Sequence, residues 1–150
     1  MATLRAVPPQ TPPPTRRPLR ILVADDDRDT ALVLATILRD EGHTVNTVLR
    51  GDEVLEVERL LRPDAVILDI NLPGTSGYAL AREIRQRHNQ LAPLLIAVSG
   101  TWRQESERLV GEAVGFDQYL LKPCEPQQII QLLEPLRSAG SASAGRRLAP

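Results

Sequence analysis

The sequence predicts an α/β fold: a five-stranded parallel sheet, doubly wound, with five helices on its two faces. Short apolar runs alternate with amphipathic segments from residue 19 to residue 137. Several runs are apolar throughout, which is typical of strands buried on both faces. Alternation of strands and helices favours a parallel sheet, because each parallel strand needs a crossover connection. The 150 residues are enough for one such domain.

The first part of the domain is predicted to contain two strands and two helices. Residues 19–24 ("LRILVA") form a buried strand, and residues 29–42 place apolar side chains at helical spacing before ending on Gly42, a favourable helix cap. Residues 44–48 ("TVNTV") alternate as a strand does. Residues 52–62 form a second helix, which stops before a proline.

The rest of the domain repeats this pattern. The predicted strands are residues 65–69, 93–99 and 118–121, and the predicted helices are residues 77–88, 104–115 and 126–137. The runs "AVILD" and "PLLIAVS" are apolar almost throughout, which indicates interior strands. The last helix begins with Pro126, a favourable first residue because that N–H has no partner within the helix.

The two ends of the chain differ from its body. Residues 1–18 hold six of the 13 prolines and are predicted to be a disordered arm, and residues 138–150 are predicted to be a flexible tail of small residues. Six of the 18 basic residues lie within residues 1–20 and 146–147, whereas all 19 acidic residues lie between them. The acidic body gives no indication of a large nucleic-acid surface.

Cysteine usage and hydropathy predict a cytoplasmic protein that does not associate with a membrane. The single cysteine, Cys124, excludes an internal disulfide framework and fits a reducing compartment. No apolar run approaches the roughly 20 residues that span a bilayer. The N-terminus has prolines where a signal peptide has its apolar segment.

Polar side chains follow the predicted strands at their carboxyl ends. They are Asp25, Asp26 and Asp27 after the first strand, Asp69 at the third, Ser99 and Gly100 at the fourth, and Lys122 and Pro123 after the fifth. Because parallel strands bring these ends to one edge, where open sheets bind ligands, we expect the side chains to converge.

Each of these residues also has an ordinary explanation. Acidic residues favour a helix N-terminus, serine is common in turns, and most lysines are solvated. Together, however, the carboxylates would repel one another unless a cation lay among them, and Mg²⁺ prefers such oxygen ligands. With Lys122 and Ser99 beside a metal held by Asp69, this edge is suited to handling a phosphoryl group.

Four motifs in a fixed order carry a resemblance to a known family. They are "VADDD", "ILDINLPGTSG", "AVSG" and "YLLKP". With them, residues 19–137 resemble the receiver (response-regulator) domain of bacterial two-component signalling, similar to the single-domain chemotaxis-type response regulators. The resemblance implies a flavodoxin-like sheet with strand order 2-1-3-4-5.

The resemblance also implies an acceptor and a metal site. Asp69 would accept a phosphoryl group from a histidine kinase or a histidine phosphotransfer protein. Asp26 and Asp69 would hold Mg²⁺, for which Mn²⁺ could substitute, through their side chains. Asn71 would add its backbone carbonyl, and Asp25 would contribute through water.

A second set of residues is implied to sense the phosphoryl group. Lys122 and Ser99 would bind its oxygens beside Gly100, Tyr119 would be the switch aromatic, and the bond before Pro123 would be cis. Four positions depart from the family's commonest pattern, none of them removing the chemistry: Thr75 in place of Met, Ser99 in place of Thr, Gly100 in place of Ala, and Cys124 in place of a larger apolar residue.

The expected function is therefore a phosphorylation switch rather than a turnover enzyme. Because 13 residues after the last helix cannot form an output domain, we expect output by protein contact, with no nucleic-acid domain, from a monomer or a phosphorylation-dependent dimer. The expected output face comprises residues 104–115, 118–121 and 126–137. A pseudo-receiver and a Mg²⁺-dependent phosphatase of the haloacid dehalogenase type are the alternatives. The first is disfavoured by the intact set Asp26, Asp69, Ser99 and Lys122, and the second by an acceptor after the third strand.

Overall fold

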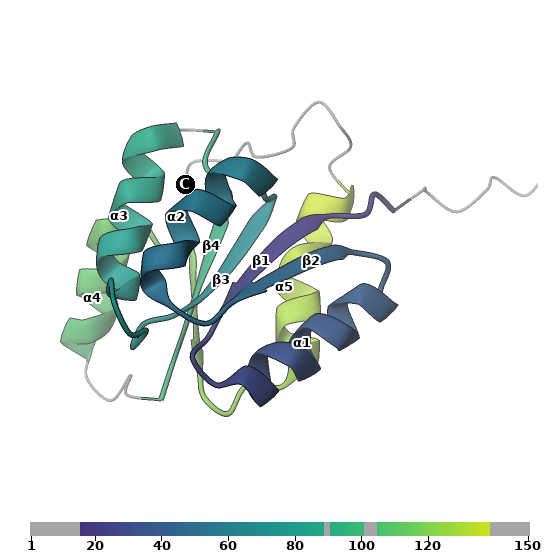
Figure 1. The fold of residues 1–150 in the computed structure, drawn as a ribbon, viewed down its shortest axis with the longest axis horizontal. Coiled ribbons are helices and arrows are strands. Elements are labelled where there is room, and N and C mark those ends of the chain that lie inside the picture. Colours follow the sequence, from purple (N-terminus) through teal and green to yellow (C-terminus); the bar gives the residue numbers. More distant parts are fainter. Residues whose placement is uncertain (1–15, 89–90, 101–104, 139–150) are drawn as a thin grey trace, which may run out of the picture.

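The computed structural model describes residues 16–88, 91–100 and 105–138. A central sheet lies between two layers of helices, with α1 and α5 on one face and α2, α3 and α4 on the other (Figure 1). The strands are β1 (Arg20–Ala24), β2 (Thr44–Val48), β3 (Ala65–Asp69), β4 (Leu94–Ser99) and β5 (Gln118–Leu121). The helices are α1 (Arg28–Asp40), α2 (Gly51–Leu61), α3 (Gly77–His88), α4 (Glu105–Val114) and α5 (Pro126–Ser138).

The sheet is parallel throughout, with strand order β2-β1-β3-β4-β5. This confirms the predicted doubly wound, flavodoxin-like architecture. The register places Ala24 opposite Leu68, Asp69 opposite Val98, and Ser99 opposite Leu121. The carboxyl ends of the four strands β1, β3, β4 and β5 are therefore nearly level, which brings the residues that follow them to one edge.

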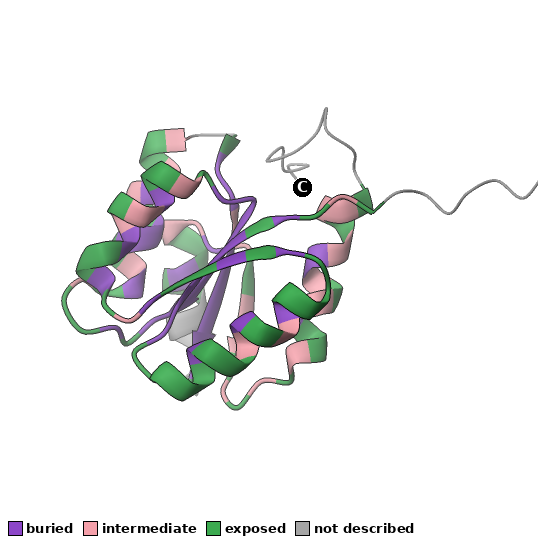
Figure 2. Ribbon diagram, turned by 45° about the vertical axis from the view of Figure 1, so that its right-hand side comes forward, coloured by how far each residue is buried: buried purple, intermediate pink, exposed green. Residues whose placement is uncertain are grey.

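Side-chain alternation along the strands divides the core in two. Leu22, Val66, Leu68 and Leu95 face the layer of α2, α3 and α4, whereas Ile21, Val23, Ile67 and Ile96 face α1 and α5. All five residues of β3 are buried. Figure 2 shows buried residues concentrated on the inner strands, with exposed residues on the outer faces of the helices and on the edge strand β2. Burial on both faces explains why these runs lack the polar alternation of a half-exposed strand.

The helix ends follow the chemistry that the sequence indicates. Asp27 caps α1 by accepting hydrogen bonds from the backbone N–H groups of Asp29 and Thr30 at 3.1 and 3.3 Å. Just after that helix, Gly42 has φ of 99°, a left-handed conformation that costs glycine no steric strain. Every predicted strand and helix is present, with its ends within two residues of the expected ones.

The segment before β1 contacts the domain. The Arg17 N–H donates to the Arg137 carbonyl at 3.5 Å, and the Arg17 guanidinium lies 3.3 Å from the buried Asp64 carboxylate. Arg16 lies 3.3 Å from Glu134 on α5. The remainder of the expected arm and all but Ser138 of the expected tail lie outside the described residues. Within the described part of the chain, no helix is both long enough and apolar enough to cross a bilayer.

Candidate functional site

Three aspartates gather at the carboxyl edge of the sheet. Asp25 follows β1 and Asp69 ends the neighbouring strand β3, and both are buried, while Asp26 is exposed. One carboxylate oxygen from each lies within 4.8 Å of the others. Carboxylate oxygens at this spacing are the donors that a hard divalent cation prefers, so the group could hold a metal ion.

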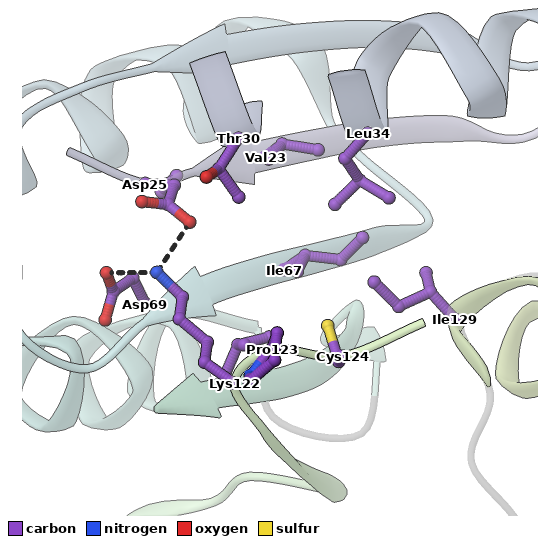
Figure 3. A pocket seen from close by; sticks show the side chains of 12 residues that line it. Val23, Asp25, Thr30, Leu34, Ile67, Asp69, Lys122, Pro123, Cys124 and Ile129 are labelled. Carbon is purple, nitrogen blue, oxygen red and sulfur yellow. Dashed lines mark hydrogen bonds and ion pairs between the residues drawn. The ribbon is translucent and has the colours of Figure 1, made fainter. Parts of the chain in front are cut away.

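Lys122 reaches the same point from the end of β5. Its ammonium lies 2.8 Å from Asp25 Oδ2 and 2.9 Å from Asp69 Oδ2, and Figure 3 shows it between the two carboxylates. The Lys122 N–H donates to the Ser99 carbonyl at 2.9 Å, which fixes its backbone beside the end of β4. The peptide bond between Lys122 and Pro123 is cis.

Burial and charge act against each other in this cluster. Burial raises the pKa of Asp25 above its ordinary value, although the hydrogen bond from Lys122 acts in the other direction. Burial alone would lower the pKa of Lys122, but its contacts with Asp25 and Asp69 outweigh burial and raise that pKa. Lys122 therefore stays charged at neutral pH. One ammonium does not balance three carboxylates, so the site favours a further cation.

Short turns orient the two buried carboxylates. Asp25 Oδ1 accepts the Asp27 N–H at 2.9 Å, and Asp69 Oδ1 accepts the Asn71 N–H at 3.0 Å. Each aspartate thus uses one oxygen for the turn that follows its strand and presents the other to Lys122. Asp27 caps α1 instead, which explains why only two of the three consecutive aspartates belong to the cluster.

The remaining predicted residues lie around this cluster. Ser99 is buried at the end of β4, while Gly100 and Asn71 are exposed in the loops that follow β4 and β3. Tyr119 lies on β5, where its hydroxyl donates to the Phe116 carbonyl at 3.2 Å and its ring packs edge-to-face on the Phe116 ring at 6.1 Å. The structure therefore brings Asp25, Asp26, Asp69 and Lys122 together and places Tyr119 on the α4 side of the sheet.

Sequence reasoning missed a cavity beside the site. Thr30 and Leu34 of α1, together with Cys124 and Ile129, line a space on the α1 and α5 side of Lys122. The only signal for it in the sequence was Cys124, where the resembled family commonly has a larger apolar residue. Cys124 itself is half-buried, which is ordinary for a small apolar side chain.

Comparison with known protein families identifies the family of the chain that carries this site. Residues 21–134 match the model of the response regulator receiver domain. The chain belongs to this family. Receiver domains are signalling switches of two-component systems. The resemblance inferred from the four sequence motifs is therefore confirmed.

Curated relatives show where such receiver domains occur. The chain is 39% identical over 125 residues to the phosphate regulon transcriptional regulatory protein PhoB of Rhizobium meliloti, covering 80% of this chain and 53% of the relative. It is 33% identical over 111 residues to BaeR of Escherichia coli, covering 74% and 45%. It is 35% identical over 111 residues to the DNA-binding response regulator MtrA of Mycolicibacterium paratuberculosis, covering 74% and 48%. The chain thus spans about half the length of these relatives.

Solved structures show the same receiver fold. The BeF3-activated N-terminal receiver domain of Klebsiella pneumoniae RstA matches with a TM-score of 0.70 at 26% identity, covering 79% of this chain and 97% of that one. The chemotaxis response regulator CheY4 of Vibrio cholerae matches with a TM-score of 0.72 at 24% identity, covering 79% and 98%.

One prediction about partners is wrong. The sequence led us to expect no nucleic-acid domain, yet the similar curated proteins include DNA-binding response regulators. The acidic body of a receiver domain carries no information on what accompanies the domain in a longer regulator. The prediction itself rested on the 13 residues after the last helix, and these say nothing about an output domain in a chain that spans about half the length of these relatives.

Proposed function

We propose that this receiver domain accepts a phosphoryl group on Asp69 and that phosphorylation changes its contacts with a protein partner. The observation that carries the proposal is the position of the Lys122 ammonium, 2.8 and 2.9 Å from Asp25 and Asp69. Asp69 is buried at a strand end yet lines the cavity at the sheet edge. A phosphoryl oxygen bound at Asp69 would meet a cation already in place.

The donor set fits Mg²⁺, with Mn²⁺ as a substitute. Asp25, Asp26 and Asp69 supply only carboxylate oxygens, and these lie within 4.8 Å of one another. The backbone carbonyl of Asn71, two residues beyond Asp69, is proposed as a further ligand. The chemistry that Mg²⁺ supplies when bound is neutralisation of negative charge and alignment of phosphoryl oxygens.

The side chains of the chain itself then have separate tasks. Asp69 is the proposed nucleophile: its Oδ1 is held by the Asn71 N–H, and its Oδ2 lies beside the Lys122 ammonium, which would meet the incoming phosphoryl oxygens. Lys122 balances charge on the phosphoryl oxygens. Ser99, buried at the end of β4, is proposed to donate a hydrogen bond to one of these oxygens beside Gly100. Tyr119 is proposed to change position when Ser99 does.

Partners follow from the same chemistry. The donor is proposed to be a histidine kinase or a histidine phosphotransfer protein, as membership of the receiver-domain family implies. Output is proposed through the face formed by residues 104–115, 118–121 and 126–137, in a monomer or a phosphorylation-dependent dimer. Because relatives are named as DNA-binding response regulators, a DNA-binding module is proposed as one contact of this face. A cytoplasmic location stays a prediction.

The test of the acceptor is a labelling experiment with a small phosphodonor. The full chain is incubated with phosphoramidate in Mg²⁺ or in EDTA, and the intact mass is measured. We expect one added phosphoryl group with Mg²⁺, none in EDTA and none in Asp69→Asn. Asp26→Asn should weaken Mg²⁺ binding roughly tenfold or more, because a charged oxygen donor is lost.

Asp40→Asn serves as the matched control, because Asp40 is an exposed aspartate at the end of α1. It should label like the unaltered chain. Full labelling of Asp69→Asn would refute the acceptor, and full labelling in EDTA would refute the metal requirement. Labelling of Lys122→Ala is expected to continue slowly, but without a change at Tyr119.

A further inference from the structure

An apolar cavity of about 290 Å³ lies behind the Lys122 side chain, between the sheet and helices α1 and α5. Val23 and Ile67 form its floor on the sheet, Leu34 closes it from α1, and Cys124 and Ile129 close it from the start of α5 (Figure 3). The cavity reaches the acidic cluster at one end, where Asp25, Asp69 and Lys122 also line it.

Charge is confined to one end of this cavity. Asp25, Asp69 and Lys122 are the charged residues that line it, and they are already paired with one another at 2.8 and 2.9 Å. Burial raises the pKa of the Cys124 thiol, so this wall is uncharged at neutral pH. The other side chains that line the cavity therefore make dispersion contacts with a ligand, and they need no charged ligand to balance them.

The small side chain at position 124 accounts for the space. Cys124 is half-buried between Pro123 and the first turn of α5, opposite the half-buried Leu34. A larger apolar side chain here would fill part of the cavity. The cavity opens toward the sheet edge, so a ligand that covers its apolar wall removes that surface from water.

We propose that this cavity binds a small, uncharged, flat apolar molecule of about two fused rings. Apolar cavities of about 150 Å³ bind benzene, and this one is roughly twice as large. Without Mg²⁺, an anion would be repelled by Asp25 and Asp69, whose charge one ammonium does not balance. A cation would have to displace Lys122 from both of them. An uncharged apolar ligand is not repelled by the carboxylates and does not have to displace Lys122.

The ligand is coupled to the acidic cluster through Lys122. A molecule packed against the aliphatic part of this side chain holds its ammonium on Asp25 and Asp69, the oxygens that Mg²⁺ would use. Ligand and Mg²⁺ therefore oppose each other, and by linkage each weakens the other's affinity by the same factor. This second statement rests on the proposed metal site, whereas binding in the cavity does not.

Indole is a suitable probe of this proposal. It is titrated into the unphosphorylated full chain without Mg²⁺ while amide NMR shifts are recorded. We expect saturable shifts at the residues around the cavity, within 30–34, 65–69 and 122–130. Cys124→Leu should weaken indole binding about tenfold or more, because its added atoms occupy the space. Cys124→Ala, the matched variant, should keep binding.

Each outcome of these experiments tests either the cavity as the indole site or its coupling to Mg²⁺. Unchanged indole affinity in Cys124→Leu, or shifts confined to other surfaces, overturns the cavity as the site. If Cys124→Leu does not fold, Leu34→Phe closes the opposite wall and is read in the same way. Indole binding that Mg²⁺ does not weaken overturns the coupling alone. Failure of Mg²⁺ to bind in the absence of indole refutes the proposed metal site and leaves the cavity result intact.

Discussion

His43 is a buried histidine that the fold uses as a hydrogen-bond acceptor. Its Nδ1 accepts the Leu19 N–H at 3.0 Å, next to β1. Burial, assisted by the nearby Arg137 charge, lowers the pKa of His43. The folded protein therefore holds the neutral ring, which keeps Nδ1 available to accept.

The sign of the pH dependence follows from that lowered pKa. In the unfolded chain His43 takes up a proton near its ordinary pKa of about 6.5, whereas in the folded chain it does so only at lower pH. The free energy of unfolding should therefore fall as the pH drops below about 6.5 and level off below the folded pKa. Urea midpoints measured between about pH 8 and pH 5 test this.

A glutamine variant isolates this contribution. His43→Gln keeps an acceptor but has no proton to gain, so its urea midpoint should change less with pH across this window. His88→Gln, at the end of α3, is the comparison variant and should retain the His43 contribution. Equal slopes for His43→Gln and the unaltered chain would show that another group is responsible.

At the scale of elements, Arg85 of α3 joins three segments. Its Nε donates to the Gly115 carbonyl at 2.7 Å after α4, and its guanidinium forms an ion pair with Asp117 before β5. Asp117 Oδ2 also accepts the Leu95 N–H of β4 at 2.8 Å. Both charged side chains are nearly buried, with 13% and 11% of their surface exposed.

Breaking this pair should cost far more than breaking a surface pair. Arg85→Ala or Asp117→Ala leaves a desolvated charge without its partner, which we expect to lower the free energy of unfolding by about 3–5 kcal/mol. Arg87→Ala removes the exposed pair with Glu83 on the same helix and should cost less than about 1 kcal/mol. Chemical denaturation of the three variants provides the comparison. Similar losses for all three would contradict the assignment.

The elements themselves were predictable, and the Arg85 contacts were not. Strand and helix periods are local properties, so apolar runs and caps such as Gly42 identified all ten elements. The convergence of Asp25, Asp69 and Lys122 followed from the rule that parallel strands end at one edge. By contrast, Arg85 and Asp117 lie 32 residues apart in helix and loop, and only packing shows that they meet.

Side-chain placement also limited what could be predicted of the site. Three consecutive aspartates look alike in the sequence, but Asp27 is used by the helix N-terminus, and Asp26 remains exposed. The cavity beside Cys124 depends on how side-chain volumes add up across five elements, β1, α1, β3, β4 and α5. The nucleic-acid prediction failed for another reason, because it was argued from the 13 residues after the last helix, whereas the relatives are about twice as long as the part that this chain matches.

At the scale of the whole molecule, the face of α4, β5 and α5 presents apolar side chains. Leu109, Val110 and Leu121 are more than half exposed. Tyr119 lies beneath this face, and an added Cβ at Gly111 would lie 2.6 Å from its ring. Because Gly111 has no side chain, the Tyr119 ring fits against α4. A movement of this ring would therefore alter the face of α4, β5 and α5 directly.

We predict that phosphorylation reaches this face. Amide shifts caused by phosphoramidate and Mg²⁺ should extend from residues 69 and 99 to residues 105–121. Gly111→Ala should shift the Tyr119 ring signals without phosphorylation, because the ring has to move. Exposed Glu112→Ala on the same helix is the control and should leave them unchanged. Shift changes confined to residues 29–62 would contradict an output face at α4, β5 and α5.

The ammonium between Asp25 and Asp69 gives the protein a counter-ion of its own. Clustered carboxylates that relied on an external ion would tie folding to the supply of that ion, and a shortage would expose the chain to proteolysis. Here the covalently attached lysine offsets part of the repulsion at all times. On the proposed metal requirement, a cell short of divalent metal would lose signalling while retaining its stock of folded protein, and signalling could resume without new synthesis.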